Sequence, residues 1–191
     1  MIIVLNGPPG CGKDTIGKLL AEKCYELGSF KVPMWEIAKA SLGDEQYDWF
    51  VKDYNNRETK EQPQEYLGGF SPRQFFIHIS EKWCKPVFGD EYFGERMLGA
   101  IKQFESHSKY DVAITDGGFA SELLPILRAH RRTLIVRLHR KGFSFAGDSR
   151  DYFRDDAYDH LPTLLRPSFL DVELINGDPG AAVASILKAV K

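Results

Sequence analysis

Cysteine is scarce in this sequence, which holds three among its 191 residues. Cys11, Cys24 and Cys84 are widely spaced and odd in number, a pattern that predicts neither a metal-ligand cluster nor a disulfide framework. We interpret them as reduced thiols, which are typical of a protein that works in the cytoplasm.

Two further features are missing, a long apolar run and a strong net charge. The run Ile2–Leu5 is too short for a signal peptide or a membrane span, and no longer run appears elsewhere, so we expect no membrane partner. The formal net charge of -2 gives no global electrostatic attraction to nucleic acid. The length and the ordinary hydrophobic fraction are typical of one soluble α/β domain with a full core.

What is present is an alternation of apolar segments that suit buried strands with segments of helical spacing. This alternation predicts a parallel sheet with right-handed crossovers and helices on both sides. We expect a single domain, residues 1–191, built on a five-stranded parallel sheet. The expected strands are Ile2–Asn6, Phe30–Pro33, Tyr110–Asp116, Thr133–Leu138 and Asp171–Asn176.

Helical spacing is expected between these strands. The first helix covers Thr15–Glu26, with Gly28 at its end, and a later one begins with Ser71 as its N-cap. The polar stretch at 43–70 leaves two interpretations open, a solvated insertion or a mobile segment that covers substrate. The other expected helices are 35–42, 91–105, 120–130 and 179–191.

A glycine-rich stretch lies between the first expected strand and the first expected helix. It reads Gly7-Pro8-Pro9-Gly10-Cys11-Gly12-Lys13, which matches G-x-x-x-x-G-K in the structural context that this motif requires. Glycines let successive backbone N–H groups point inward, and the helix N-terminus adds its positive dipole end. We predict that these residues bind ATP and that the lysine reaches its β- and γ-phosphates, with a chance glycine turn as the alternative.

Asp14 stands where such loops normally place Ser or Thr, and Thr15 follows it. The usual hydroxyl at this place binds Mg²⁺, an ion that prefers oxygen ligands and keeps several waters. We predict that Asp14 holds Mg²⁺ directly or through water. Thr15 contributes its hydroxyl to the same ion or, as the alternative, lies near the α-phosphate. The alternative for Asp14 is an acid that is favoured by the helix dipole alone.

The stretch GKDT resembles the phosphate loop of the deoxynucleoside monophosphate kinases of tailed phages, within the nucleoside-monophosphate-kinase-like P-loop group. The resemblance implies a three-layer P-loop NTPase fold, ATP and Mg²⁺ as cofactors, and transfer of the γ-phosphate to a deoxynucleoside monophosphate. It also implies the host cytoplasm as the location of a viral protein. Further stretches fall in the family's order: WEIAKASL with Lys39, SPRQFF with Arg73, YDVAITD with Asp116, VRLHRKG with Arg140 and LINGD with Asn176.

The resemblance assigns roles to four of these residues. It implies that Lys39 and Arg73 face the acceptor, that Arg140 precedes a lid at about 140–155, and that Asn176 lies near the adenine. The planar fork of an arginine suits a phosphate group. A surface arginine in a first helical turn is the alternative for Arg73.

Asp116 is expected at the carboxyl end of a strand, where parallel α/β sheets place their ligands. It would hold the Mg²⁺ shell, or act as general base if the acceptor is an alcohol, and the alternative is an Asp that caps the next helix. The family has an Arg after this Asp, whereas this chain has Gly117 and Gly118, which leave room for another group close to the backbone. A second hypothesis is therefore a phage kinase that phosphorylates 5-hydroxymethyluracil in DNA.

The stretch between residues 128 and 154 is rich in arginine. Arg140 and Arg150 flank a Gly- and Ser-containing segment that suits a lid, and we predict that they stabilise charge on the transferred phosphoryl group. A surface ion pair with a nearby Asp is the alternative for Arg150. Arg131 and Arg132 precede a strand, so we expect them in solvent at the opposite end of the sheet.

Two questions stay open at the level of sequence. One is a third hypothesis for the function, a module that binds nucleotide without transferring phosphate. The other is the oligomeric state, with a homodimer among the alternatives.

Overall fold

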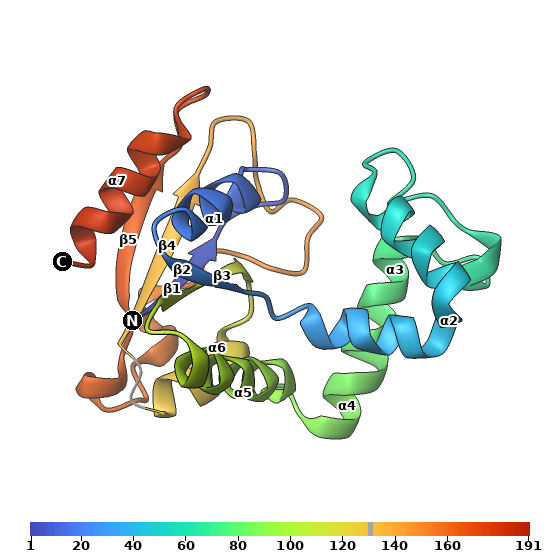
Figure 1. Cartoon of the computed structure of the whole chain (residues 1–191), viewed down its shortest axis with the longest axis horizontal. Helices are drawn as coiled ribbons and strands as arrows, with labels where there is room; N and C mark the ends of the chain where they lie inside the picture. The colour runs from blue at the N-terminus through green and yellow to red at the C-terminus, as the bar shows by residue number, and fades with distance from the viewer. Residues whose placement is uncertain (130–131) are drawn as a thin grey trace. The chain divides into compact units, whose positions relative to one another are not determined.

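The computed structural model describes residues 1–129 and 132–191, so the predicted helix end at His130 and the predicted exposure of Arg131 lie outside the described residues. The chain divides into two compact units, Met1–Phe30 with Phe93–Lys191, and Lys31–Tyr92. The first unit holds the sheet and the second is helical (Figure 1). Within the described ranges, no helix combines the length and the apolar character that crossing a membrane requires.

The sheet of the first unit has five parallel strands, as predicted, and their order is β2-β3-β1-β4-β5. The carboxyl ends of β1, β3 and β4 are neighbours, so the segments that follow these strands meet at one edge. The strands are β1 Ile2–Asn6, β2 Tyr25–Gly28, β3 Asp111–Gly117, β4 Thr133–His139 and β5 Ser168–Glu173.

Helices cover both faces of this sheet. Figure 1 shows α1 (Lys13–Ala21) and α7 (Pro179–Ala189) on one face, with α5 (Tyr92–His107) and α6 (Ala120–Arg128) on the other. Buried side chains of α1, α7 and the strands form one apolar core beneath the first pair of helices. Two short 3-10 helices precede β5, at Asp155–Tyr158 and Thr163–Leu165.

The second strand lies earlier in the chain than predicted, and the prediction of a strand at Phe30–Pro33 was wrong. Cys24 falls on the helical spacing of α1, but its φ of 64° takes the chain out of the helix before it. Tyr25 then enters the sheet as a buried residue. Gly28, predicted to end the helix, lies in β2, where a Cβ would come within 3.0 Å of Met97 Cε on α5.

The second unit contains the whole polar stretch at 43–70, and that stretch is helical through Asn55. Gly43, with a φ of 72°, interrupts the long helix. Ser71 is an N-cap, as predicted, and forms a capping box with Gln74. The elements are α2 Val32–Asn55, a 3-10 turn at Glu65–Leu67, α3 Pro72–Ile77, a π-helix at His78–Cys84 and α4 Lys85–Phe88.

An aromatic cluster gives the second unit its core. The ring of Phe50 is fully buried, and its centroid lies 5.1–5.9 Å from those of Trp35, Tyr54, Phe75 and Phe76. Most of these pairs meet edge to face, an arrangement that adds to the gain from burying the rings.

Candidate phosphate-binding site

The loop between β1 and α1 needs glycine at three positions. The φ angles are 74° at Gly10 and 121° at Gly12, in the left-handed region that favours glycine. A Cβ on Gly7 would come within 2.9 Å of both Cys11 Sγ and the Leu138 carbonyl oxygen. The loop therefore curls tightly into the N-terminus of α1, which is the geometry that presents backbone N–H groups to an anion.

Lys13 begins α1, and its side chain folds back over the loop. Its Nζ donates to the carbonyl oxygens of Gly7, at 2.6 Å, and Pro8, at 2.8 Å. The positive charge is thus held at the loop by the loop's own backbone.

Asp14 and Thr15 follow in the first turn of α1, and both are exposed. Across the described residues, no group of three or more His, Cys, Asp or Glu side chains gathers in a way that could hold a metal ion. Mg²⁺ needs few protein ligands when phosphate and water complete its shell. A carboxylate and a hydroxyl beside the loop are therefore a sufficient donor set for this ion.

A pocket of ≈ 180 Å³ adjoins the loop. Arg140 lies at its wall and donates from Nη1 to the Cys11 carbonyl oxygen at 3.2 Å. Its Nε and Nη2 donate to Asn176 Oδ1, at 3.0 and 2.7 Å. The structure thus brings two predicted site residues together, from the segments after β4 and β5. The pocket is lined by Cys11, Gly12, Thr15, Ile16, Arg140, Leu174, Ile175, Gly177 and Pro179.

The Cys11 thiol packs under the loop and is almost completely buried. Burial raises the pKa of this thiol, although the nearby positive charge of Lys13 works in the opposite direction. The side chain therefore contributes packing, while its backbone carbonyl binds Arg140.

Asp116 lies near the end of β3 and is 9% exposed. Its Oδ2 accepts from Ser29 Oγ at 2.7 Å, and its Oδ1 accepts from the Phe30 backbone N–H at 3.0 Å. It does not cap α6, because the N-cap of that helix is Phe119. The buried carboxylate instead holds the chain that leaves β2.

Arg150 forms an ion pair, as one of its two interpretations predicted, but the pair is not on the surface. Its Nη2 lies 2.7 Å from Asp148 Oδ2, and the two side chains are 16% and 3% exposed. The aliphatic part of Arg150 passes over Gly118, where a Cβ would lie 2.4 Å from its Cδ. The room that the glycine leaves is therefore occupied by this arginine.

Lys39 and Arg73 belong to the second unit. Lys39 is exposed, with its Nζ 3.9 Å from Asp44 Oδ1. Arg73 Nη1 lies 3.5 Å from Glu61 Oε1. Both basic groups thus lie near solvent-exposed acids of their own unit, at distances that make only loose ion pairs.

The sequence missed Asn6, the last residue of β1. Its side chain is fully buried and bonds to Gly117, Asp151 and Phe153. The sequence did show a polar residue at the end of an otherwise apolar strand. Its hydrogen-bond partners lie more than 100 residues away, so the sequence could not identify them.

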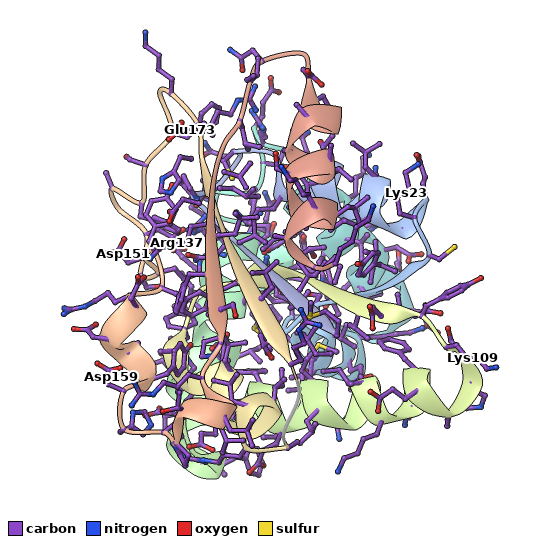
Figure 2. All side chains as sticks on the ribbon, turned by 90° about the vertical axis from the view of Figure 1, so that its left-hand side faces the viewer. Lys23, Lys109, Arg137, Asp151, Asp159 and Glu173 are labelled. Carbon is purple, nitrogen blue, oxygen red and sulfur yellow. The ribbon has the colours of Figure 1, made fainter. Side chains whose placement is uncertain are left out.

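Arg137 of β4 also fastens the segment at residues 151–153 to the sheet. Figure 2 labels Arg137 and Asp151. Arg137 Nη1 donates to the Phe153 carbonyl oxygen at 3.1 Å and also binds Asp155. Its Nε and Nη2 donate to Asp171 of β5, at 2.9 and 2.5 Å. These hydrogen bonds hold the pKa of Asp171 below its ordinary value.

Comparison with known proteins finds similarity of structure and none of sequence. No family's sequence pattern and no curated protein matches the chain. The solved structure of a dephospho-CoA kinase from Campylobacter jejuni is similar at a TM-score of 0.51 and 12% identity, covering 99% of this chain and 96% of that one. A shikimate kinase from Aquifex aeolicus gives a TM-score of 0.41 at 17% identity, covering 100% and 96%. The fold is that of the P-loop kinases, as predicted.

Proposed function

We propose that this chain transfers the γ-phosphate of ATP, with Mg²⁺, to a nucleotide acceptor. The observation that carries the proposal is the Lys13 ammonium, held over the glycine loop by the Gly7 and Pro8 carbonyl oxygens. A cation beside a helix N-terminus and a curled loop favours a polyphosphate. The fold supports the same reaction class, since the similar structure with a TM-score of 0.51 is a kinase.

The pocket beside the loop supports ATP as the donor. A planar guanidinium can stack on a purine, and the bonds of Arg140 to Asn176 fix its plane at the pocket wall. We infer that the adenine lies against Arg140, with its phosphates running along the loop to Lys13.

The first turn of α1 supports Mg²⁺ as the cofactor. Asp14 and Thr15 present two oxygen donors there, next to Lys13, and would hold the ion together with water and phosphate oxygens. Bound Mg²⁺ would neutralise charge on the β- and γ-phosphates. Asp116 already accepts hydrogen bonds with both oxygens, so we expect it to reach the ion through water.

We favour a deoxynucleoside monophosphate as the acceptor. Residues 31–92, which contain Lys39 and Arg73, hold eight Lys and Arg against eleven Asp and Glu. An excess of acids disfavours the extended phosphate backbone of DNA, whereas one arginine fork is enough for a single phosphate group.

Asp116 favours a second candidate, a kinase for 5-hydroxymethyluracil in DNA. An alcohol acceptor must lose a proton during transfer, and a phosphate acceptor need not. Each carboxylate oxygen has two lone pairs, so the Asp116 oxygen that accepts from the Ser29 hydroxyl at 2.7 Å can still take the proton of an acceptor alcohol.

The test is transfer of label from γ-labelled ATP in the presence of Mg²⁺. The acceptors are the four deoxynucleoside monophosphates, 5-hydroxymethyl-dUMP, and DNA with and without 5-hydroxymethyluracil. Lys13→Ala should abolish transfer, and Lys18→Ala, which changes an exposed lysine on the same helix, should not. Label in a diphosphate supports the favoured acceptor, and label in hydroxymethylated DNA alone supports the second. Tight ATP binding with no transfer to any acceptor would instead support a non-catalytic module.

A further inference from the structure

The chain from 151 to 153 is fastened to the sheet by a buried amide. Asn6 Nδ2 donates to the carbonyl oxygens of Asp151, at 3.1 Å, and Gly117, at 3.2 Å. Its Oδ1 accepts from the Phe153 backbone N–H at 3.0 Å. The same residue pairs with Gly117 in the sheet register and directly precedes the phosphate loop. The segment therefore returns to the sheet at the root of that loop.

Arg150 precedes this fastened segment, and its side chain follows a path that only a glycine permits. A Cβ on Gly118 would lie 2.4, 2.7 and 3.1 Å from Cδ, Cγ and Cβ of Arg150. The φ of Gly118 is not in the left-handed region, so space rather than backbone conformation demands glycine here. Because Gly117 pairs with Asn6, which directly precedes the phosphate loop, Gly118 and the arginine that passes over it lie next to the start of that loop.

Asp148 fixes the guanidinium at the end of this path. Its Oδ1 accepts from Nε of Arg150 at 2.8 Å and its Oδ2 accepts from Nη2 at 2.7 Å, a bidentate arrangement. Oδ1 also accepts from the Arg150 backbone N–H at 3.0 Å. The carboxylate is 3% exposed, so water competes little for these bonds.

We propose that Arg150 is a stationary catalytic residue, held beside the phosphate loop by Gly118 and Asp148 as positioning residues, rather than a group delivered by closure of a lid. The proposal rests on the proposed phosphotransfer. In this proposal, the segment at 140–155 contributes two arginines, Arg140 at the nucleotide pocket and Arg150 at the transferred phosphoryl group.

Arg150 takes no covalent part in the phosphoryl transfer, whose bonds and electrons balance between ATP and the acceptor. The bond between the γ-phosphorus and the β,γ-bridging oxygen breaks, and its electron pair leaves with ADP. A new bond forms from an acceptor oxygen to the same phosphorus, and an alcohol acceptor passes its proton to Asp116. Arg150 donates hydrogen bonds to the γ-phosphoryl oxygens and exchanges no atom.

Transfer rates of four variants test the proposal, with the acceptor that wild-type protein uses. Arg150→Ala should lower kcat about 10³-fold with little change in the KM for ATP, the loss expected for a guanidinium that acts in the transition state. Gly118→Ala should lower kcat by about 10²-fold, the typical effect of displacing one transition-state donor. In the Arg150→Ala background, Gly118→Ala should cost almost nothing more, because the residues act as a unit. Guanidinium ion should partly restore Arg150→Ala, and the exposed control Arg154→Ala should match wild type.

The outcomes separate the two proposals. Independent, multiplicative losses from Arg150→Ala and Gly118→Ala would overturn the positioning role, and unchanged kcat in Arg150→Ala would overturn the catalytic one. Either result leaves phosphotransfer intact, whereas wild-type protein that transfers nothing overturns phosphotransfer itself.

A spectroscopic measurement tests the stationary arginine without relying on activity. In ¹⁵N-arginine-labelled protein without nucleotide, the Nε–H of Arg150 should exchange slowly with water, and Asp148→Asn should abolish that protection. The peak is assigned by its loss in Arg150→Lys. Exchange as fast as that of exposed Arg154 would show that Arg150 is not held in place.

Discussion

The two compact units hold the charged residues of the proposed site in different ways. In the first, Lys13, Arg140 and Asp116 bind backbone groups, and Arg150 binds a carboxylate that is 3% exposed. In the second, Lys39 and Arg73 face carboxylates that are 95% and 56% exposed, at 3.9 and 3.5 Å. Backbone partners and buried pairs fix a side chain, while exposed pairs contribute little and rearrange readily. Under the proposed function, the difference predicts a preorganised site for the phosphate donor and an adaptable site for the acceptor.

The strongest test of this contrast is Asp116→Asn. The amide can keep hydrogen bonds to Ser29 and Phe30, so the fold should survive while the proton acceptor is lost. Transfer to an alcohol should fall about 10²- to 10⁴-fold, the usual contribution of a general base, and transfer to a monophosphate should fall much less. The measurement is kcat with matched alcohol and monophosphate acceptors. Equal losses with both acceptors would show that Asp116 is not a general base.

Phe50→Ala tests whether the aromatic cluster stabilises the second unit independently of the first. Truncating this fully buried ring should destabilise the second unit by about 3–5 kcal/mol. If the units are energetically separate, ATP binding by the first unit should persist. Denaturant unfolding and nucleotide titration check this, with Trp49→Ala, which changes a neighbour that is 46% exposed, as the control. Loss of both properties in one transition would support the predicted single domain.

Arg73→Ala probes the acceptor side. An arginine that clamps one acceptor phosphate should raise the acceptor KM by about tenfold, the value of roughly one charged hydrogen bond, without changing the KM for ATP. The matched control is Arg57→Ala, an exposed arginine of the same unit. A rise in both KM values would point to a structural role.

Asp171→Asn and Asp44→Asn compare a fixed ion pair with a loose one. Hydrogen bonds from Arg137 lower the folded-state pKa of Asp171 below its unfolded value, so its stabilisation is present at neutral pH and disappears as pH falls through the folded pKa. Asp171→Asn should cost at most about 1 kcal/mol at pH 7, because the carboxylate is half exposed.

Asp44→Asn should cost nothing measurable, since its partner lies 3.9 Å away in solvent. Urea unfolding at neutral and acidic pH measures both variants. A cost for Asp171→Asn that grows as the pH falls would contradict the assigned sign.

Local sequence signals predicted the parts of the molecule whose physics is local. The apolar run at Ile2–Asn6 predicts a buried strand, and the glycine spacing of residues 7–13 predicts the loop. The helix at 43–55 was missed because polar residues dominate this stretch, and its aromatic residues become a core only when α3 packs against them. The Asn6 bonds and the path of Arg150 over Gly118 join residues far apart in sequence, and no local pattern encodes such contacts.

The bonds of Lys13 to its own loop have a consequence for affinity. Under the proposed function, phosphate binding would be an exchange reaction, in which phosphate oxygens replace the carbonyl oxygens of Gly7 and Pro8 as partners of the ammonium. Only the difference between the two sets of bonds contributes to binding. A single phosphate group should therefore compete poorly against the loop, and a chain of three, which also engages the helix N-terminus and the metal, should compete well. We therefore expect the loop to discriminate between ligands by their number of linked phosphates.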